Sequence, residues 1–239
     1  MNIILLKSDD WIAADVVVLR DHRASHIRDV LRSAVGDSLR VGLLGGQRGL
    51  GIINSLDGGG VQLTVTLSEP PPPRHRFDIV LALPRPKMLR RILRTAAEFG
   101  VAHLHLIHSA RVEKSYWQSP LLQPEHLDAA LRAGLERSMD TVAPQVHLHQ
   151  RFRPFVEDQL TDLCAGRPCW IADKDGRRSL GEMPAEPAVV MIGPEGGFVP
   201  FEVALTEGVI AERVHLGCRI LSVDTALPAV LAQALPGVA

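Results

Sequence analysis

Residues 188–198 read AVVMIGPEGGF, a run of five apolar residues that ends in a loop rich in glycine and proline. A short apolar run bounded by turn residues is typical of a buried strand. Because glycine has no side chain, the loop after this strand can bring its main chain close to a ligand. A second strand-like run, RVHL at residues 213–216, is followed in the same way by Gly217. We therefore expect two strands whose following loops close on one ligand.

Two such loops suggest that the ligand is recognised by main-chain N–H and C=O groups, which suits a purine. The first loop is not a phosphate-binding P-loop, because no Gly-Lys-Ser/Thr follows it, and it lacks the Gly-x-Gly-x-x-Gly spacing of dinucleotide-binding folds. Two ordinary glycine turns at strand ends would give the same pattern. The residues alone leave both interpretations open.

Length and composition favour a folded protein of one large or two small domains. The chain has 239 residues, of which 46% are hydrophobic, and this supplies apolar surface for real cores. The first residues, MNIILLK, lack the basic region and long apolar core of a secretory signal, and no apolar run reaches membrane-spanning length. The three cysteines, Cys164, Cys169 and Cys218, form no pair with metal-type spacing. We expect reduced thiols in a cytoplasmic protein without membrane contact.

Charge is distributed unevenly, although the net charge is −1. Residues 1–73 carry seven Lys/Arg and eight Asp/Glu, residues 74–117 carry nine and three, and residues 118–239 carry ten and sixteen. The balances are −1, +6 and −6, so cations gather in the middle segment. One basic face is enough to hold a phosphate backbone. Ordinary solvated charges are the alternative.

Four consecutive prolines, residues 70–73, mark the boundary between two regions. A polyproline segment is a stiff spacer that cannot join a sheet. Before it we expect one helix at residues 24–34 and the short strands of a small β-barrel. The expected strands are residues 16–19, 38–41, 50–53 and 61–66. The predicted parts are a domain of residues 1–69, a linker of 70–76 and a domain of 77–239.

After the linker, strand and helix patterns alternate. The expected strands are residues 77–83, 103–106, 145–148, 169–172, 189–192 and 214–216. The expected helices are residues 87–99, 123–139, 154–164, 200–209 and 225–235. This alternation predicts an α/β fold, a parallel sheet with helices on both faces.

The string IGPEGGF at residues 192–198, followed by LGCRIL at 216–221, resembles the signature of the 16S rRNA (uracil-N3)-methyltransferase family. Upstream stretches match the same family, so the likeness spans nearly the whole chain. They are Lys87-Met88 with EFGV at 98–101, SARVEKS at 109–115, and His26-Ile27 with VLRSAVGD at 30–37. That family belongs to the SPOUT class of knotted methyltransferases that use S-adenosylmethionine.

The resemblance implies a C-terminal SPOUT α/β knot, in which the final segment threads through an earlier loop, and a small N-terminal PUA-like β-barrel that helps to place the substrate. It implies S-adenosylmethionine as cofactor, 16S rRNA of the small ribosomal subunit as substrate, and methylation of N3 of a uridine. It also implies a homodimer, with residues 226–235 and the acidic half of the second domain as interface candidates. The implied cofactor-binding residues are Leu83, Ala172, Ile192, Gly193, Pro194, Glu195, Gly196, Gly197, Leu216, Gly217, Ile220, Leu221, Ser222, Thr225 and Ala226.

Methyl transfer from a sulfonium needs no covalent enzyme intermediate, because the cofactor carries its own leaving group. The enzyme must hold donor and acceptor in line and exclude water. Uracil N3 becomes nucleophilic as its imide proton leaves, so a base, or donors to O2 and O4, would promote transfer. By residue type and position, Glu195 and Asp224 are candidates for the base or for orienting the substrate, and Arg219 for stabilising the anion. An alternative for Glu195 is a helix N-terminal carboxylate that satisfies the amides of its own turn.

Two blocks depart from the family pattern. Residues 222–226 read SVDTA where the family has Arg-Thr-Glu-Thr-Ala, so a guanidinium is lost and the carboxylate is one methylene shorter. Residues 136–141, ERSMDT, replace a Glu-Gln-x-x-Arg-x block, and Arg137 is a candidate for the missing cation. Cofactor binding depends on backbone loops and stays supported. The catalytic set and the target base remain open.

Cations of the barrel helix and the basic segment are candidates for contacts with rRNA phosphates. Plain exposure is the alternative for His22 and His26. Tyr116 and Trp117 would stack on an extruded base or lie in a dimer core. The His-x-His pairs at 103/105 and 147/149 are interpreted as packed or surface imidazoles, and no metal is expected. The expected RNA-binding residues are Arg23, His26, Arg28, Arg32, Arg85, Lys87, Arg90, Arg91, Arg111 and Lys114.

Two other classes of function remain. A non-catalytic RNA-binding relative, or a methyltransferase acting on a different RNA base, would account for Ser222 and Asp224. An ordinary α/β nucleotide-binding or small-molecule enzyme would account for glycine loops that converge by chance. An assay of methyl transfer to small-subunit particles distinguishes the first class from an rRNA methyltransferase. A binding preference for S-adenosylmethionine over ATP and NAD distinguishes the second class from it.

Overall fold

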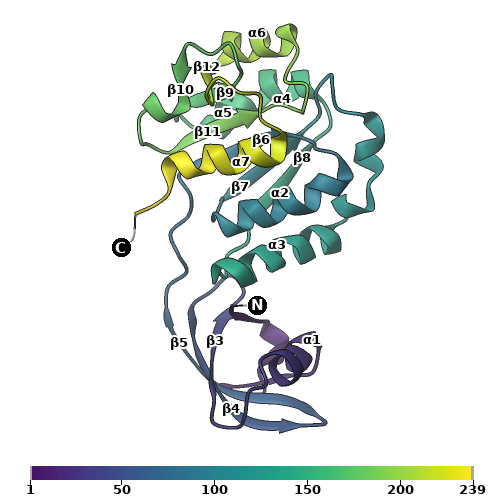
Figure 1. Cartoon of the computed structure of the whole chain (residues 1–239), viewed down its shortest axis with the longest axis vertical. Coiled ribbons are helices and arrows are strands. Elements are labelled where there is room, and N and C mark those ends of the chain that lie inside the picture. Colours follow the sequence, from purple (N-terminus) through teal and green to yellow (C-terminus); the bar gives the residue numbers. More distant parts are fainter. Residues whose placement is uncertain (1, 238–239) are drawn as a thin grey trace. The chain divides into compact units, whose positions relative to one another are not determined.

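The computed structural model describes residues 2–237, which form two compact units (Figure 1). The first unit is Met1–Pro72 together with Leu135–Ala143, and the second is Pro73–Gly134 together with Pro144–Ala239. Met1, Val238 and Ala239, which the predicted domain boundaries include, lie outside the described residues. The junction falls within the proline run.

Five strands form a mixed sheet in the first unit, in the order β1-β3-β4-β5-β2. β1 pairs with β3 in parallel, and the other neighbours are antiparallel. The strands are β1 (Ile4–Leu6), β2 (Val16–Leu19), β3 (Ser38–Leu43), β4 (Arg48–Asp57) and β5 (Gly60–Glu69). Each of the four predicted strands lies within β2 to β5, whereas the prediction lacked β1.

This curled sheet encloses one apolar core because its side chains alternate between two faces. Along β4, Ile53 is buried while Leu50 and Ile52 point outward and are exposed. The core consists of Ile4, Leu6, Val17, Leu19, Ala24, Ile27, Val41, Ile53, Val61, Leu63 and Val65. A half-barrel with one helix packed into it is the result.

The helix of the first unit begins earlier and ends sooner than the predicted residues 24–34. α1 (His22–Ser25) begins after Asp21, whose Oδ1 accepts a hydrogen bond from the Arg23 N–H at 3.0 Å, and it continues as a π-helical turn, His26–Val30. Arg32 has a φ of 53°, a left-handed value that a right-handed helix does not contain. The helical path therefore cannot extend to residue 34.

Leu135–Ala143 completes the first unit from a distant part of the chain. The Asn2 N–H donates to the Glu136 carbonyl at 2.8 Å, and the Thr141 hydroxyl donates to the Gly46 carbonyl at 2.5 Å. A Cβ at Gly42 would overlap the Thr141 methyl group, so this contact requires glycine. The block at residues 136–141 that departs from the family pattern thus has a structural role in this unit.

Seven parallel strands form the sheet of the second unit, in the order β10-β12-β9-β11-β6-β7-β8. The strands are β6 (Phe77–Ala82), β7 (His103–Ile107), β8 (Gln145–His149), β9 (Cys169–Ala172), β10 (Arg178–Ser179), β11 (Ala188–Ile192) and β12 (Glu212–His215). The predicted parallel sheet is confirmed, and the two-residue β10 is the one strand that the prediction lacked.

Helices cover both faces of this sheet, as predicted (Figure 1). They are α2 (Pro86–Glu98), α3 (Pro124–Ser138), α4 (Phe152–Asp158), α5 (Leu160–Cys164), α6 (Pro200–Val209) and α7 (Val223–Leu231). α7 packs against α2 and β11, and α4 packs against α6. The predicted helix 154–164 is two helices, because Gln159 leaves the helical region with φ −125°. The described helices include none with the length and apolarity to cross a membrane.

Candidate cofactor and RNA site

The two predicted loops and the loop after β9 lie at the carboxyl ends of three neighbouring strands of the parallel sheet. β12, β9 and β11 are neighbours, and in their register Ala172 pairs with both Ile192 and Val214. The carboxyl ends of the three strands are therefore level, so the loops that follow Ala172, Ile192 and His215 lie side by side. Ligands of open α/β sheets bind at such carboxyl ends. Leu83 follows the next strand, β6, and is buried there with its N–H donating to the Ile107 carbonyl at 2.8 Å.

The loop after β11 is folded tightly upon itself. A Cβ at Gly193 would lie 3.0 Å from the Phe198 nitrogen and 3.2 Å from its ring. Phe198 is buried and contacts the ring of Phe152, with centroids 5.7 Å apart. The Gly197 N–H closes the turn on the Pro194 carbonyl at 2.7 Å. A side chain at residue 193 would therefore crowd Phe198, so glycine suits the internal packing of this loop.

The loop after β12 is open. Gly217 has φ 106°, and a Cβ there would meet no atom within 4 Å. Within residues 2–237, the N–H and C=O groups of Cys218 to Leu221 form no backbone hydrogen bond. Ile220 is 85% exposed. This loop therefore presents free main-chain donors and acceptors, together with an apolar side chain, at the edge where the three loops meet.

The candidate catalytic residues occupy different surroundings. Asp224 lies in the first turn of α7, is mostly buried, and pairs with Arg91 of α2 at 3.2 Å. Arg219 is exposed in the open loop, and Glu195 is exposed in the glycine loop. The Gly197 N–H of this turn already donates to the Pro194 carbonyl, and α6 begins five residues after Glu195, so Glu195 does not lie at a helix N-terminus. At the start of α7, the hydroxyl oxygens of Ser222 and Thr225 are 3.0 Å apart and share a hydrogen bond.

Tyr116 lies within electrostatic range of two other candidate residues, Arg85 and Glu195. Its hydroxyl donates to Glu113 at 3.0 Å. The pKa of Tyr116 is raised, first by desolvation, then by Glu113, with Arg85 opposing and Glu195 contributing to the rise. Arg85, Glu195 and Tyr116 therefore lie within one electrostatic neighbourhood. The neighbouring Trp117 donates its indole N–H to His108 Nδ1 at 3.0 Å.

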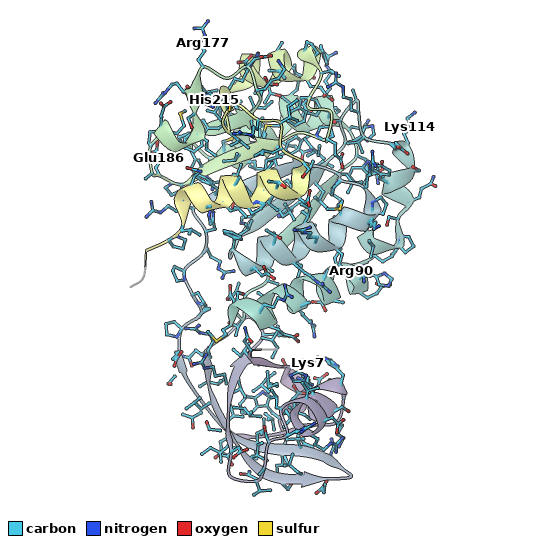
Figure 2. All side chains as sticks on the ribbon, in the orientation of Figure 1. Lys7, Arg90, Lys114, Arg177, Glu186 and His215 are labelled. Atoms are coloured by element: carbon cyan, nitrogen blue, oxygen red, sulfur yellow. The ribbon has the colours of Figure 1, made fainter. Side chains whose placement is uncertain are left out.

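Several expected RNA-binding cations form an exposed group on the second unit. They are Arg85, Lys87, Arg90, Arg91 and Lys114, from α2 and the loop that follows β7. Figure 2 shows the side chains of Arg90 and Lys114 directed away from the ribbon. Arg111 differs, because its guanidinium donates to the Gly196 carbonyl and, at 3.3 Å, to the Gly197 carbonyl. The structure thus attaches this cation to the glycine loop.

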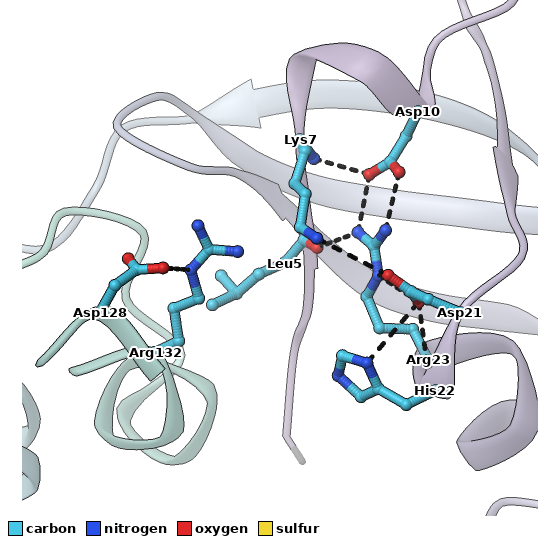
Figure 3. Close-up of polar contacts among 8 residues, drawn as sticks. All are labelled: Leu5, Lys7, Asp10, Asp21, His22, Arg23, Asp128 and Arg132. Carbon is cyan, nitrogen blue, oxygen red and sulfur yellow. Dashed lines mark hydrogen bonds and ion pairs between the residues drawn. The ribbon is translucent and has the colours of Figure 1, made fainter. Parts of the chain in front are cut away.

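Arg23 of the first unit is buried and satisfied by protein groups (Figure 3). Its guanidinium donates to Asp10 through two nitrogens at 2.6 and 2.7 Å, to Asp21 at 2.8 Å, and to the Leu5 carbonyl at 2.6 Å. Burial alone would lower the pKa of Arg23, but the two carboxylates outweigh burial and raise it. For Asp21, burial alone would raise the pKa, but the hydrogen bonds from Arg23 outweigh burial and lower this pKa to about 2.

Arg23 is therefore a structural residue, and the sequence prediction that it contacts RNA does not fit its burial. A phosphate contact needs a cation whose N–H donors are accessible from solvent. The other predicted residues of this unit remain at the surface. Arg28 is exposed and donates to the Asp57 carbonyl at 2.9 Å, Arg32 is exposed, and His26 is partly buried.

Four histidines that the sequence presented as two separate pairs form one ladder across β7 and β8. His103 Nδ1 lies 3.2 Å from His147 Nε2, and His105 Nδ1 lies 3.1 Å from His149 Nε2. The rings of His105 and His147 stack with centroids 4.4 Å apart. Burial, followed by the neighbouring histidines, lowers the pKa of His105 to about 3, so this imidazole is neutral. Within the described part of the chain, no three His, Cys, Asp or Glu side chains are grouped to hold a metal ion.

Glu202 is a buried carboxylate beside the glycine loop that the sequence analysis missed. It is 3% exposed, and its carboxylate accepts hydrogen bonds from the Ala110 N–H at 2.7 Å and the Val199 N–H at 3.0 Å. A glutamate at position N3, three residues after the N-cap of a helix, is a known signal for a helix start. That signal was present in Val199-Pro200-Phe201-Glu202, but it could not disclose the second bond to Ala110.

Comparison with known proteins bears on the whole parallel-sheet unit. Residues 70–235 match the model of the RNA methyltransferase domain. The chain is 27% identical to ribosomal RNA small subunit methyltransferase E of Treponema pallidum (strain Nichols), over 98% of this chain and 91% of that protein. It is 28% identical to the protein of the same name from Synechocystis sp. (strain ATCC 27184 / PCC 6803 / Kazusa), over 96% of this chain and 76% of that protein.

The fold is also that of a solved structure. Ribosomal RNA small subunit methyltransferase E from Neisseria gonorrhoeae, bound to S-adenosyl methionine, superposes with a TM-score of 0.74 at 17% identity. The match covers 98% of this chain and 95% of that one. The segment that matches the family model contains every strand of the parallel sheet and all three loops at its edge. The chain therefore belongs to the RNA methyltransferase family.

Proposed function

We propose that this protein transfers a methyl group from S-adenosylmethionine to N3 of a uridine in 16S rRNA of the small ribosomal subunit. The observation that carries the proposal is the meeting of three loops at the carboxyl edge of β12, β9 and β11 in a chain of this family. The names of the relatives from T. pallidum and Synechocystis support ribosomal RNA as the substrate. The choice of uridine N3 follows from the family signature at residues 192–198 and 216–221.

The cofactor would lie against these loops, with its adenine facing the open loop after β12. The unpaired main-chain groups of residues 218–221 and the empty space beside Gly217 fit a ligand that is recognised by backbone groups. The S-adenosyl methionine bound to the N. gonorrhoeae protein supports the choice of ligand. When bound, S-adenosylmethionine would supply an electrophilic methyl group. Ala172, Ile192, Leu216 and Leu221 would provide the apolar contacts.

The chain itself must then orient the uracil and manage its proton. Asp224 is our candidate for accepting the N3 proton, because Arg91 holds its carboxylate in one orientation at the start of α7. Arg219 would donate to O2 or O4 as negative charge develops there. Glu195, close to Arg85 and Tyr116, would orient the base. Closure of the site around the uracil would exclude water.

Exposed cations would hold the RNA backbone with little sequence preference. We assign this role to Arg85, Lys87, Arg90, Arg91 and Lys114 of the second unit, and to His26, Arg28 and Arg32 of the first. Arg23 is omitted because it is buried. The first unit, which contains residues 2–69 of the predicted domain, would help to place the substrate as a PUA-like barrel. Tyr116 would supply an aromatic face for an extruded base.

Three further parts of the proposal concern the assembly. We propose a trefoil knot, in which the segment after β12 passes through an earlier loop before α7 packs on α2 and β11. We also propose a homodimer that uses α7 and the acidic half of the second unit, and a cytoplasmic location. Light scattering should report twice 26.1 kDa; a monomer at micromolar concentration would argue against the dimer.

The direct test is methylation of small-subunit particles with labelled S-adenosylmethionine, followed by mapping of the modified base. N3-methyluridine in 16S rRNA is the expected product. Label on another base would revise the target, and tight RNA binding without turnover would favour a non-catalytic RNA-binding protein, the alternative that Ser222 and Asp224 raise. Calorimetry should give binding of S-adenosylmethionine but not of ATP or NAD; equal binding of all three would contradict the proposed cofactor.

A further inference from the structure

Glu202 stands out as a buried carboxylate that has no cationic partner among the described residues. Its side chain is 3% exposed, and no ion pair involves it within residues 2–237. A buried charge is costly unless hydrogen bonds satisfy it. Here the bonds come from two backbone N–H groups, and the first turn of α6 adds the favourable end of the helix dipole.

The two N–H groups belong to different loops. Ala110 lies in the loop after β7, and Val199 directly follows the glycine loop after β11. In the sheet, β6 alone separates β7 from β11. The Glu202 carboxylate therefore joins two loops across the carboxyl end of β6, where Leu83 forms part of the candidate cofactor site.

Arg111 makes a second connection between the same two loops. It is the residue after Ala110, and its guanidinium donates to the carbonyls of Gly196 and Gly197. The stem of Arg111 also packs on the glycine loop, since a Cβ at Gly196 would lie 3.0 Å from Arg111 Cδ. One connection places an anion among N–H groups, and the other places a cation among C=O groups.

We propose that Glu202 and Arg111 form a two-point clasp that fixes the shape of the glycine loop, and that Glu202 is a positioning residue for the cofactor site. In this assignment Arg111 serves the glycine loop and not an RNA phosphate. The clasp also couples the two substrates, because the loop after β7 continues into Glu113, Lys114 and Tyr116. The inference rests on the proposed function for its ligand, but its effect on loop order does not.

The test compares hydrogen exchange and ligand binding in four variants of the full chain. Glu202→Gln keeps the shape of the side chain but replaces one acceptor by an NH2 group, which faces an N–H and cannot accept its bond. Arg111→Ala removes the second connection, and Arg111→Lys keeps the charge but replaces the planar guanidinium, whose Nη1 donates to both carbonyls, by an ammonium on a different stem. Glu207→Gln is the matched control, because Glu207 lies on the same helix in an exposed ion pair with Arg213.

In the free protein, we expect the amides of residues 110, 193 and 195–199 to exchange about tenfold faster in Glu202→Gln, Arg111→Ala and Arg111→Lys, and at the wild-type rate in Glu207→Gln. The same three variants should bind S-adenosylmethionine about tenfold more weakly in calorimetry. Their affinity for RNA should change less than their affinity for the cofactor. Thermal unfolding of each variant shows whether it remains folded at the assay temperature.

Unchanged exchange and cofactor affinity in Arg111→Lys, with RNA binding lost in Arg111→Ala, would return Arg111 to the RNA surface and overturn the clasp. Uniformly faster exchange throughout the second unit in Glu202→Gln would show a general stability role instead, and would also overturn it. If the wild-type protein does not bind S-adenosylmethionine, the proposed function fails. The exchange experiment on the free protein would still decide on the clasp.

Discussion

The glycine loop after β11 and the loop after β12 carry the two halves of one family signature, but their surroundings are opposite. The first is packed, with Phe198 buried against Phe152 and its carbonyls held by Arg111. The second is open, with unpaired main-chain groups and Ile220 in solvent. The glycines of one motif therefore have two different surroundings. Gly193 is packed against Phe198, whereas a Cβ at Gly217 would meet no atom within 4 Å.

The largest expected effect comes from removing the packed side chain of the first loop. Phe198→Ala should lower the free energy of unfolding by about 3–5 kcal/mol, because the buried ring leaves a cavity. Phe201→Ala, three residues later, removes a ring that is 58% exposed and should change stability by less than about 0.5 kcal/mol. Urea denaturation measures both. Equal losses would mean that the first loop is not packed as described.

The open loop should respond in activity and not in stability. Arg219→Ala should reduce kcat by about 10²–10³-fold, because it removes a donor to the developing anion. Its free energy of unfolding should stay within about 0.5 kcal/mol of wild type, since the side chain is exposed. Single-turnover methylation and urea denaturation together separate the two effects. An Arg219→Ala variant with full activity would remove Arg219 from the proposed mechanism.

We expect acid to destabilise the parallel sheet through His105. His105 has an ordinary pKa of 6.5 when unfolded and about 3 when folded, because it is buried beside His147, His149, His103 and Arg167. The unfolded chain therefore binds a proton that the folded chain does not, and stability is lost as pH falls below 6.5. One such group contributes a slope of about 1.4 kcal/mol per pH unit.

Stability measured by urea denaturation between pH 7 and pH 4 should therefore fall more steeply in the wild type than in His105→Gln. The remaining slope in the variant comes from other groups, including His147 and His149, whose pKa values burial also lowers. If stability fell equally steeply with pH in the wild type and in His105→Gln, His105 would have to bind its proton equally in the folded and unfolded states, contrary to the prediction.

The smallest effect is a direct comparison of the two glycines. Gly193→Ala should destabilise by about 1–3 kcal/mol, because the new Cβ meets the Phe198 backbone at 3.0 Å. Gly217→Ala meets no atom within 4 Å, so only its φ of 106° is unfavourable. We expect about 1 kcal/mol there, since an open loop can relax. The reverse order would exchange the roles given to the two loops.

Local patterns predicted the parts of the fold that depend on short segments. The run at 188–192 became β11, the helix expected at residues 87–99 became α2 (Pro86–Glu98), and the proline run lies at the junction of the units. The alternation of strand and helix patterns along the chain was also enough to predict the parallel sheet. In each case the signal lies within a few residues of its consequence.

What the sequence could not disclose depends on contacts between distant residues. Arg23 resembled a surface cation, but Asp10, thirteen positions away, makes it a buried ion pair. Glu202 resembled a helix-start residue until its second partner, Ala110, was known. The two His-x-His pairs become one ladder only because β7 and β8 are neighbours. Charge and residue type are local, whereas burial and partnership are properties of the folded chain.

The contribution of Leu135–Ala143 to the first unit has a consequence for synthesis. Residues 1–72 emerge from the ribosome without Glu136 and Thr141, which later bond to Asn2 and Gly46. The nascent half-barrel must therefore wait for residues 73–134 of the second unit to be made before its last partners arrive. A gene cut at the prolines would yield an incomplete N-terminal piece, and any excised version should carry this later segment as a separate peptide or a grafted tail.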